Sequence, residues 1–177
     1  MSNRRYRVPL TMIRAALCLV LAYVLPFLTG QIPTIGAMLC PMHLPVLLCG
    51  FLCGWQWGLT VGAVAPLIRS LTLGVPIWFP NAICMALELA AYGAISGLLY
   101  LLLSKKRGGI YISMLTAMLF GRLLWGASMF VLVGLRGGSF GFSAFLAGAF
   151  INAIPGIILQ IVLIPVIVRL VTRKVGK

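Results

Sequence analysis

The sequence predicts an all-α membrane protein, a six-transmembrane-helix bundle with both termini cytoplasmic. Of the 177 residues, 62% are hydrophobic and only 8% are charged, whereas about a quarter of the residues of a soluble domain are charged. A helix needs about 20 apolar residues to cross the hydrocarbon core of a bilayer, and the chain consists almost entirely of such runs. No internal repeat is found, so we expect a single integral membrane domain over residues 1–177.

The first three helices are expected at about residues 8–28, 42–53 and 59–73. The first is an apolar run ending near Pro26. Arg14 within this run and the lack of a small-residue cleavage site distinguish it from a signal peptide. The second and third helices are short for simple spans, so we expect a tilt or an irregular break. The segment GWQWG, residues 54–58, is expected to form the turn between them.

The other three helices are expected at about residues 82–103, 110–135 and 143–171. The loop GVPIWFPN before the first of these is stiffened by Pro76 and Pro80, and the segments SKKRGG and RGGSFGF separate the others. Proline lacks the backbone N–H of a helix interior and clashes with the preceding turn. We therefore expect the last helix to bend near Pro155 and Pro165.

The positions of lysine and arginine predict the orientation, because cytoplasmic loops carry the excess of basic residues. With six spans, the N-terminus, the loop after the fourth helix and the C-terminus fall on one side. The basic clusters lie in these three places: Arg4, Arg5, Arg7, Lys105, Lys106, Arg107, Arg173, Lys174 and Lys177. The net charge of +13 therefore flanks the membrane, and we expect no nucleic-acid partner.

No catalytic or metal-binding set is apparent in the sequence. The five cysteines are scattered along apolar segments without a CxxC motif, so we interpret them as small core residues. A lone acid and a lone histidine give little support for an intramembrane hydrolase. The GxxxxGK[ST] phosphate loop is also missing from the sequence. We expect no cofactor and no enzyme activity, with any ATP hydrolysis in separate subunits.

A few polar residues interrupt the predicted spans, and on insertion scales an ionisable group inside a bilayer costs about 2.5–3.5 kcal/mol. Several of them are expected at a similar depth near the outer surface, and one lies mid-helix: His43, Arg69, Asn81, Glu88, Asn152 and, deeper, Arg122. Glu88 is about two turns, or roughly 10 Å, below the start of its helix. Polar side chains from several helices at one depth indicate a water-accessible pocket that opens to the outside.

A structural interpretation of the same residues is also open. Glu88 and Arg69 would pair to lower each other's burial cost, while His43 and Asn81 lie among the headgroups. Arg122 favours a binding site, because one acid cannot neutralise two arginines and the surplus suits an anionic substrate. Arg122 could instead bond to backbone carbonyls or face a partner protein.

Two aromatic residues in the outer loop before the fourth helix have two open interpretations. Trp78 and Phe79 are either interfacial anchors or part of a lid over the pocket, since their loop is framed by prolines. Trp55 and Trp57 are interpreted as anchors.

Two segments resemble a known family. The stretch PMHLPVLLCGFLCGWQWGLTVGAVAPLIRSLTLGVP, residues 41–76, and MALELAAYGAISGLLY, residues 85–100, are similar to helices two to four of the substrate-binding S components of energy-coupling factor (ECF) vitamin transporters. The resemblance implies an outward site in a prokaryotic plasma membrane, with His43, Arg69, Asn81, Glu88 and Asn152 at matching positions. It also implies a membrane scaffold (T) subunit and two ATPase subunits as partners, and a toppling motion that releases substrate inside.

The family's first helix docks on the scaffold through small residues at four-residue spacing, which let helices approach closely. Here the approximate matches are three pairs: Thr11 and Ala15, Met12 and Ala16, and Cys18 and Ala22.

The sequence leaves two classes of substrate open. Two arginines against one glutamate favour a molecule with a negative group and hydroxyls or amides. Pantothenate fits that description, and the MHLPV segment resembles members assigned to it. A neutral pyridine or pyrimidine vitamin precursor, stacked on Trp78 or Phe79, is the alternative.

Two other functions compete with an S component. A self-sufficient secondary carrier would usually show a repeat or matching broken helices, and a structural protein of the cell envelope would need no pocket.

Overall fold

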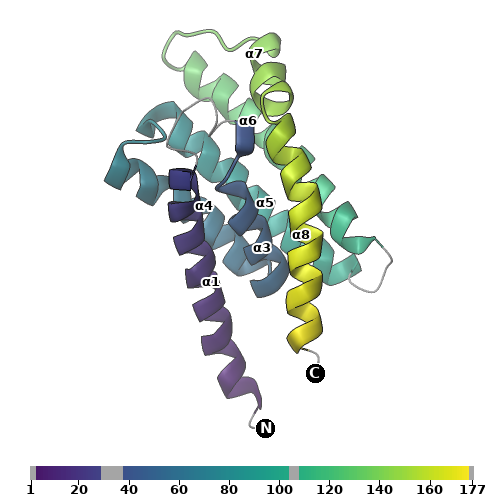
Figure 1. The fold of residues 1–177 in the computed structure, drawn as a ribbon. Helices are drawn as coiled ribbons and strands as arrows, with labels where there is room; N and C mark the ends of the chain where they lie inside the picture. Colours follow the sequence, from purple (N-terminus) through teal and green to yellow (C-terminus); the bar gives the residue numbers. More distant parts are fainter. Residues whose placement is uncertain (1–2, 29–37, 104–107, 176–177) are drawn as a thin grey trace.

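The computed structural model describes the backbone of residues 3–28, 38–103 and 108–175, and this part of the chain is helical with no strand (Figure 1). Each of the six expected helices has a counterpart, so the prediction of an all-α membrane protein is confirmed. The basic residues Lys105, Lys106, Arg107 and Lys177 lie outside the described residues. So do the side chains of Arg4, Arg5, Arg7, Arg173 and Lys174.

The helices that match the first three expected spans are α1 (Asn3–Leu28), α3 (His43–Cys53) and α4 (Trp55–Leu73). The expected turn over GWQWG is wrong, because only Gly54 separates α3 from α4. Gly54 has φ 95° and ψ 167°, a backbone conformation that is open to glycine and strained for other residues. Its N–H bonds to the carbonyl of Gly50, and its own carbonyl accepts the N–H of Gly58. One residue thus ends one helix and begins the next.

The second half of the chain forms α5 (Ile83–Leu103), α6 (Gly109–Gly134), α7 (Phe142–Leu146) and α8 (Ile154–Val175). A π-helical turn, Trp78–Ala82, precedes α5 and another, Ala147–Ile151, follows α7. The last expected helix is therefore broken before Pro155, which confirms the bend predicted there. Pro155 lies in the first turn of α8, where its missing N–H costs no helical hydrogen bond. Pro165 lies inside the continuous α8.

Four helical stretches in the described residues are long and apolar enough to cross a membrane. They are Pro9–Leu28, Trp78–Leu103, Gly109–Gly134 and Phe142–Thr172. The apolar α3 has only 11 residues and covers about 16 Å at 1.5 Å per residue. Both termini lie at the same end of the bundle (Figure 1), as an even number of crossings requires.

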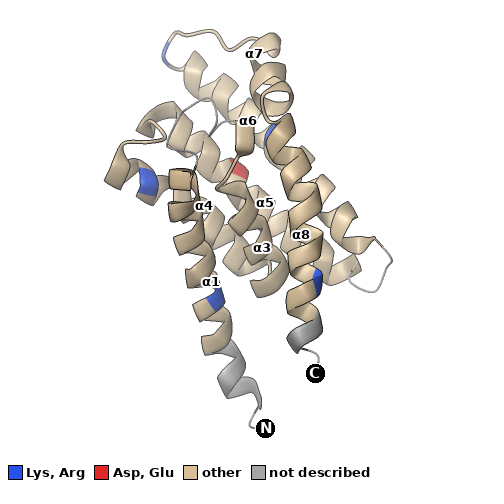
Figure 2. Cartoon of the chain, in the orientation of Figure 1, with Lys and Arg blue, Asp and Glu red and all other residues tan. Residues whose placement is uncertain are grey.

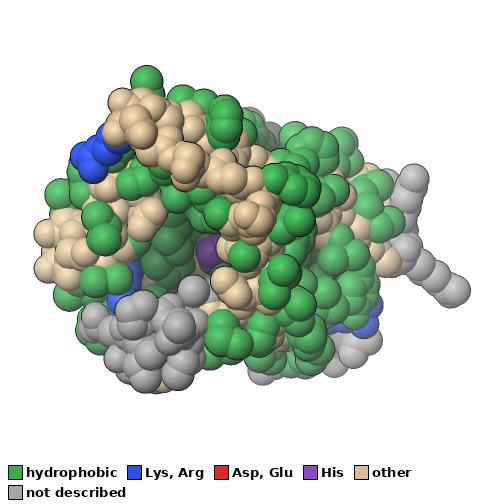
Figure 3. Space-filling model, turned by 90° about the horizontal axis from the view of Figure 1, so that it is seen from above, with side chains coloured by type: hydrophobic (Ala, Val, Ile, Leu, Met, Phe, Trp, Pro, Cys, Tyr) green, Lys and Arg blue, Asp and Glu red, His purple; other side chains and the backbone are tan. Residues whose placement is uncertain are grey.

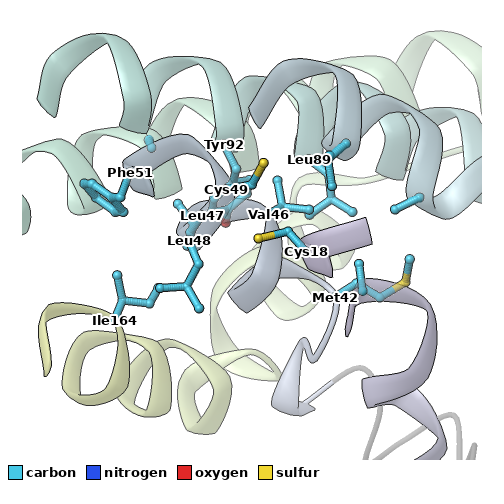
Figure 4. Packing of buried hydrophobic residues seen from close by; sticks show 14 of the residues in the cluster. Cys18, Met42, Val46, Leu47, Leu48, Cys49, Phe51, Leu89, Tyr92 and Ile164 are labelled. Carbon is cyan, nitrogen blue, oxygen red and sulfur yellow. The ribbon is translucent and has the colours of Figure 1, made fainter. Parts of the chain in front are cut away.

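Helix α3 lies at the centre of the bundle, with α1 and α8 on either side of it (Figure 1). Its side chains Val46, Leu47 and Cys49 are fully buried. They pack with Leu89 and Tyr92 of α5 and the other members of the core shown in Figure 4. A short central helix surrounded by longer ones is thereby held on several sides.

Glycines bring α3, α4 and α5 into close backbone contact. A Cβ atom added to either Gly50 or Gly58 would lie 2.5 Å from the carbonyl oxygen of Gly93. A Cβ on Gly97 would lie 2.7 Å from the carbonyl oxygen of Gly50. Small residues at helix interfaces let membrane helices approach closely, so these glycines fix the three-helix layer that carries the polar site.

Candidate functional site

Three ionisable side chains from three helices meet inside the bundle. Glu88 of α5 forms an ion-pair contact with each of the other two. His43 Nε2 of α3 lies 3.3 Å from Glu88 Oε1, and Arg122 Nη1 of α6 lies 3.1 Å from the same oxygen. All three are buried, with 2–6% of their surface exposed. Glu88 is the only acid of the chain, and it lies in the half of the bundle away from the termini (Figure 2).

Local features of the sequence position each member of this cluster. Cys40 has a positive φ of 47°, and its carbonyl accepts the N–H of His43 at 3.0 Å, so a tight turn places His43 at the start of α3. Tyr92 lies one turn after Glu88 on α5, and its ring meets the imidazole edge-on with centroids 5.1 Å apart. A Cβ on Gly121 of α6 would lie 2.7 Å from the Tyr92 ring. The glycine therefore lets α6 bring the neighbouring Arg122 to Glu88.

Arg122 has a second partner that the sequence interpretation missed. Its Nη2 donates a hydrogen bond to Cys40 Sγ at 3.2 Å. The proximity of Cys40 to His43 in the sequence was the available signal, but the thiol was assigned to the core with the other cysteines. Cys40 is instead part of the cluster, and the other four cysteines with described side chains lie on α1, α3 and α5.

The cluster balances its charge internally but leaves hydrogen-bonding capacity open. The carboxylate neutralises the guanidinium, which lowers the cost of burying both. The two ion pairs are close contacts rather than aligned hydrogen bonds. Within the described part of the chain, Glu88 Oε1, both ring nitrogens of His43 and Arg122 Nε have no hydrogen-bond partner. Buried polar atoms are normally hydrogen-bonded, so this concentration of open positions is typical of a site that binds a polar ligand.

A hollow leads to this cluster from the end of the molecule opposite the termini. In the view onto that end, the chain's only histidine is visible inside the hollow (Figure 3). His43 in this hollow contacts Glu88, which in turn pairs with Arg122, so the hollow is where the pocket predicted from the sequence would lie.

Arg69 is buried at a different place. Its Nη1 donates a hydrogen bond to the carbonyl oxygen of Tyr23 at 2.7 Å, and its guanidinium lies 5.2 Å from the ring centroid of Phe27. The alternative in which Glu88 pairs with Arg69 is therefore wrong, because the carboxylate pairs with Arg122 and His43. Arg69 links α4 to the last turns of α1.

The remaining predicted site residues lie outside the cluster. Trp78 is 47% exposed, and Asn81 and Asn152 are also exposed. The ring of Phe79 is half-buried, with the guanidinium of Arg136 4.2 Å from its centroid. This contact joins the segment before α5 to the loop after α6.

The predicted docking residues of α1 divide into two groups. Ala15, Cys18 and Ala22 are buried in the protein's own core, so they offer no free surface here. Ala16 and Met12 are exposed, and Thr11 is half-buried. A partner that approached α1 in this conformation would therefore meet the face with Met12 and Ala16.

A separate groove of about 490 Å³ lies at the end of α6, where it is lined by Phe130, Leu135 and Phe140 among others. Its lining contains no ionisable side chain. An apolar groove on a membrane-spanning helix is suited to lipid contact.

The family model of the ECF transporter substrate-specific component matches residues 10–168. The chain belongs to this family. Comparisons with curated proteins and with solved structures give no match. The resemblance seen in residues 41–100 is thus confirmed at the level of the family. Since the family description names no substrate, the choice between pantothenate and a heterocycle is still a prediction for this substrate-specific component.

Proposed function

We propose that this substrate-specific component binds a vitamin or vitamin precursor with high affinity outside a prokaryotic cell and delivers it through the plasma membrane. In this proposal both termini are cytoplasmic and the hollow at the opposite end faces outward. The observation that carries the proposal is the buried cluster of His43, Glu88 and Arg122 below that hollow. A structural membrane protein would have no use for a buried group of polar atoms with open hydrogen-bonding positions.

The energy would come from a complex with a membrane scaffold (T) subunit and two ATPase subunits. Docking would use the exposed face of α1 that holds Met12 and Ala16, and the loaded protein would topple to release its substrate inside. To test this, uptake would be measured in cells that express the chain alone or together with the scaffold and ATPases. Uptake by the chain alone would indicate an autonomous secondary carrier instead.

Pantothenate is the first substrate to test. It has a carboxylate for an arginine, together with hydroxyls and an amide for the cluster. A pyridine or pyrimidine precursor is the second candidate, since Glu88 is an acceptor for ring N–H or amino groups and Trp78 and Phe79 offer aromatic faces.

The direct experiment is mass spectrometry of small molecules released from the detergent-purified protein. A tight binder would carry about one equivalent of its substrate through purification. An empty protein that also shows no thermal shift with a vitamin panel would contradict the proposed function.

Glu88→Gln gives the matched test of the site. The amide is the same size as the carboxylate but cannot balance Arg122, so we expect affinity to fall at least about tenfold in a protein that still folds. Arg169→Gln, on the exposed surface of α8 away from the cluster, is the control and should leave binding unchanged.

A further inference from the structure

We propose that the cluster of His43, Glu88 and Arg122 binds a neutral, hydrogen-bond-donating group of the substrate, such as a hydroxyl or an amide, and that any anionic group of the same molecule binds further out, at Arg69. This inference rests on the proposed function and specifies the chemistry and orientation of its ligand.

The first argument is charge balance. Glu88 and Arg122 neutralise each other at 3.1 Å, so the interior of the site has no surplus positive charge when His43 is neutral. A carboxylate placed there would lie beside the Glu88 carboxylate, and like charges in a buried site repel strongly. A neutral polar group avoids this repulsion.

The second argument is the donor or acceptor character of the open hydrogen-bonding positions. His43 Nε2 faces the carboxylate, which favours the proton on Nε2 and leaves Nδ1 as an acceptor. Glu88 Oε1, which already takes part in both ion pairs, is a second acceptor, while Arg122 Nε is a donor. None of these three atoms makes a hydrogen bond within the described residues. A hydroxyl or an amide can donate to the acceptors and accept from the arginine, which a carboxylate cannot do.

The third argument is the location of the other buried arginine. Arg69 has no carboxylate partner in the described part of the chain, where the ion pairs of Glu88 go to His43 and Arg122. Its contacts are a backbone carbonyl and an aromatic ring, neither of which carries a full negative charge. Of the two buried arginines, Arg69 is therefore the one with an unbalanced charge.

Helix register gives the separation between the two subsites. Gly62 lies against the backbone of Leu89, and Gly58 against that of Gly93, so α4 and α5 run antiparallel and Arg69 is level with about position 82 of the chain. Glu88 is six residues further along α5, or about 9 Å at 1.5 Å per residue. A ligand that reaches both groups is elongated, with its neutral end inward and its anionic end towards the loop before α5.

The experiment compares a matched pair of ligands that differ only in the anionic group: pantothenate, which carries a carboxylate, and panthenol, which carries a hydroxyl in its place. Binding to the purified protein would be measured by calorimetry. We expect the neutral member of the pair to retain affinity within about tenfold. Methylation of a hydroxyl or amide N–H in the neutral portion should instead lower affinity by about 100-fold.

Two variants assign the subsites. Arg69→Gln should weaken only the anionic member and so remove the difference within the pair. His43→Ala should weaken both members equally. Thermal unfolding of each variant checks the fold, and the ligand pair on the unaltered protein decides the question even if a variant fails to fold.

The outcomes separate this inference from the proposed function. If a ligand binds only with its carboxylate and Arg69→Gln leaves that preference intact, the orientation is overturned while the transport function stands. If no member of the panel binds and no small molecule copurifies, the proposed function fails and this inference fails with it.

Discussion

The two buried arginines of this protein lie in sites that meet the cost of burial in different ways. Arg122 has a carboxylate at 3.1 Å, with a thiol and a histidine in the same cluster. Arg69 has a backbone carbonyl at 2.7 Å and the face of a phenylalanine ring. The charge of Arg122 is therefore balanced within the protein, whereas the positive charge of Arg69 is available to a ligand.

The difference indicates how each site couples stability to function. Removing one member of a buried ion pair leaves the other uncompensated. A buried cation held only by neutral groups carries its desolvation cost without a compensating charge, so an apolar side chain of similar length can replace it at little cost. We therefore expect the cluster around Glu88 to be important for both folding and binding. Arg69 should matter mainly for binding.

The largest expected effect is that of Glu88→Ala. It leaves Arg122 buried without its carboxylate, so the free energy of unfolding should fall by about 3–5 kcal/mol, measured by reversible unfolding in detergent. The double variant Glu88→Leu with Arg122→Met removes both charges and should recover most of this loss while failing to bind substrate. A single variant as stable as the unaltered protein would show that the ion pair does not stabilise the fold.

An intermediate effect is expected from the glycine layer that supports the cluster. Gly93→Ala would push a methyl group into the backbone of Gly58, and overpacking of this kind typically costs about 1–3 kcal/mol. The matched control is Gly134→Ala on α6, where an added Cβ meets nothing within 4 Å. Equal thermal unfolding of the two variants would mean that α4 and α5 separate without cost.

Much of the fold could be predicted from the sequence because the bilayer imposes simple length and polarity rules. Apolar runs located the helices, four of which are long and apolar enough to cross a membrane, and the cost of an intramembrane charge singled out His43, Glu88 and Arg122 as site candidates. The turn over residues 54–58 was misplaced because a single glycine at positive φ reverses the chain. That conformation is not evident from the sequence GWQWG, which has a glycine at each end.

The pairing within the site could not be predicted, because depth along a helix does not give its rotation. Glu88 was assigned an alternative partner in Arg69 by depth alone, while the rotation of α6 beside Gly121 selects Arg122. Cys40 was missed because a thiol partner for arginine has no sequence signature. The packing of Gly58 and Gly62 against α5, by contrast, does have a sequence signature, the GxxxG spacing. That spacing was not used to predict the contact.

The smallest effect on stability is expected at Arg69, where the comparison between the two arginines is sharpest. Arg69→Met keeps the length of the side chain and removes a buried charge that has no carboxylate partner. The carbonyl of Tyr23 lies within α1, where a helical hydrogen bond is available to it. The free energy of unfolding should therefore change by less than about 1 kcal/mol or rise, while the affinity for a carboxylate-bearing substrate falls.

Arg122→Met is the counterpart of this variant. It leaves the Glu88 carboxylate buried without its guanidinium partner and should lower both stability and binding. If both methionine variants destabilise the protein equally, the Arg69 charge is already balanced, and the difference drawn between the two sites does not hold.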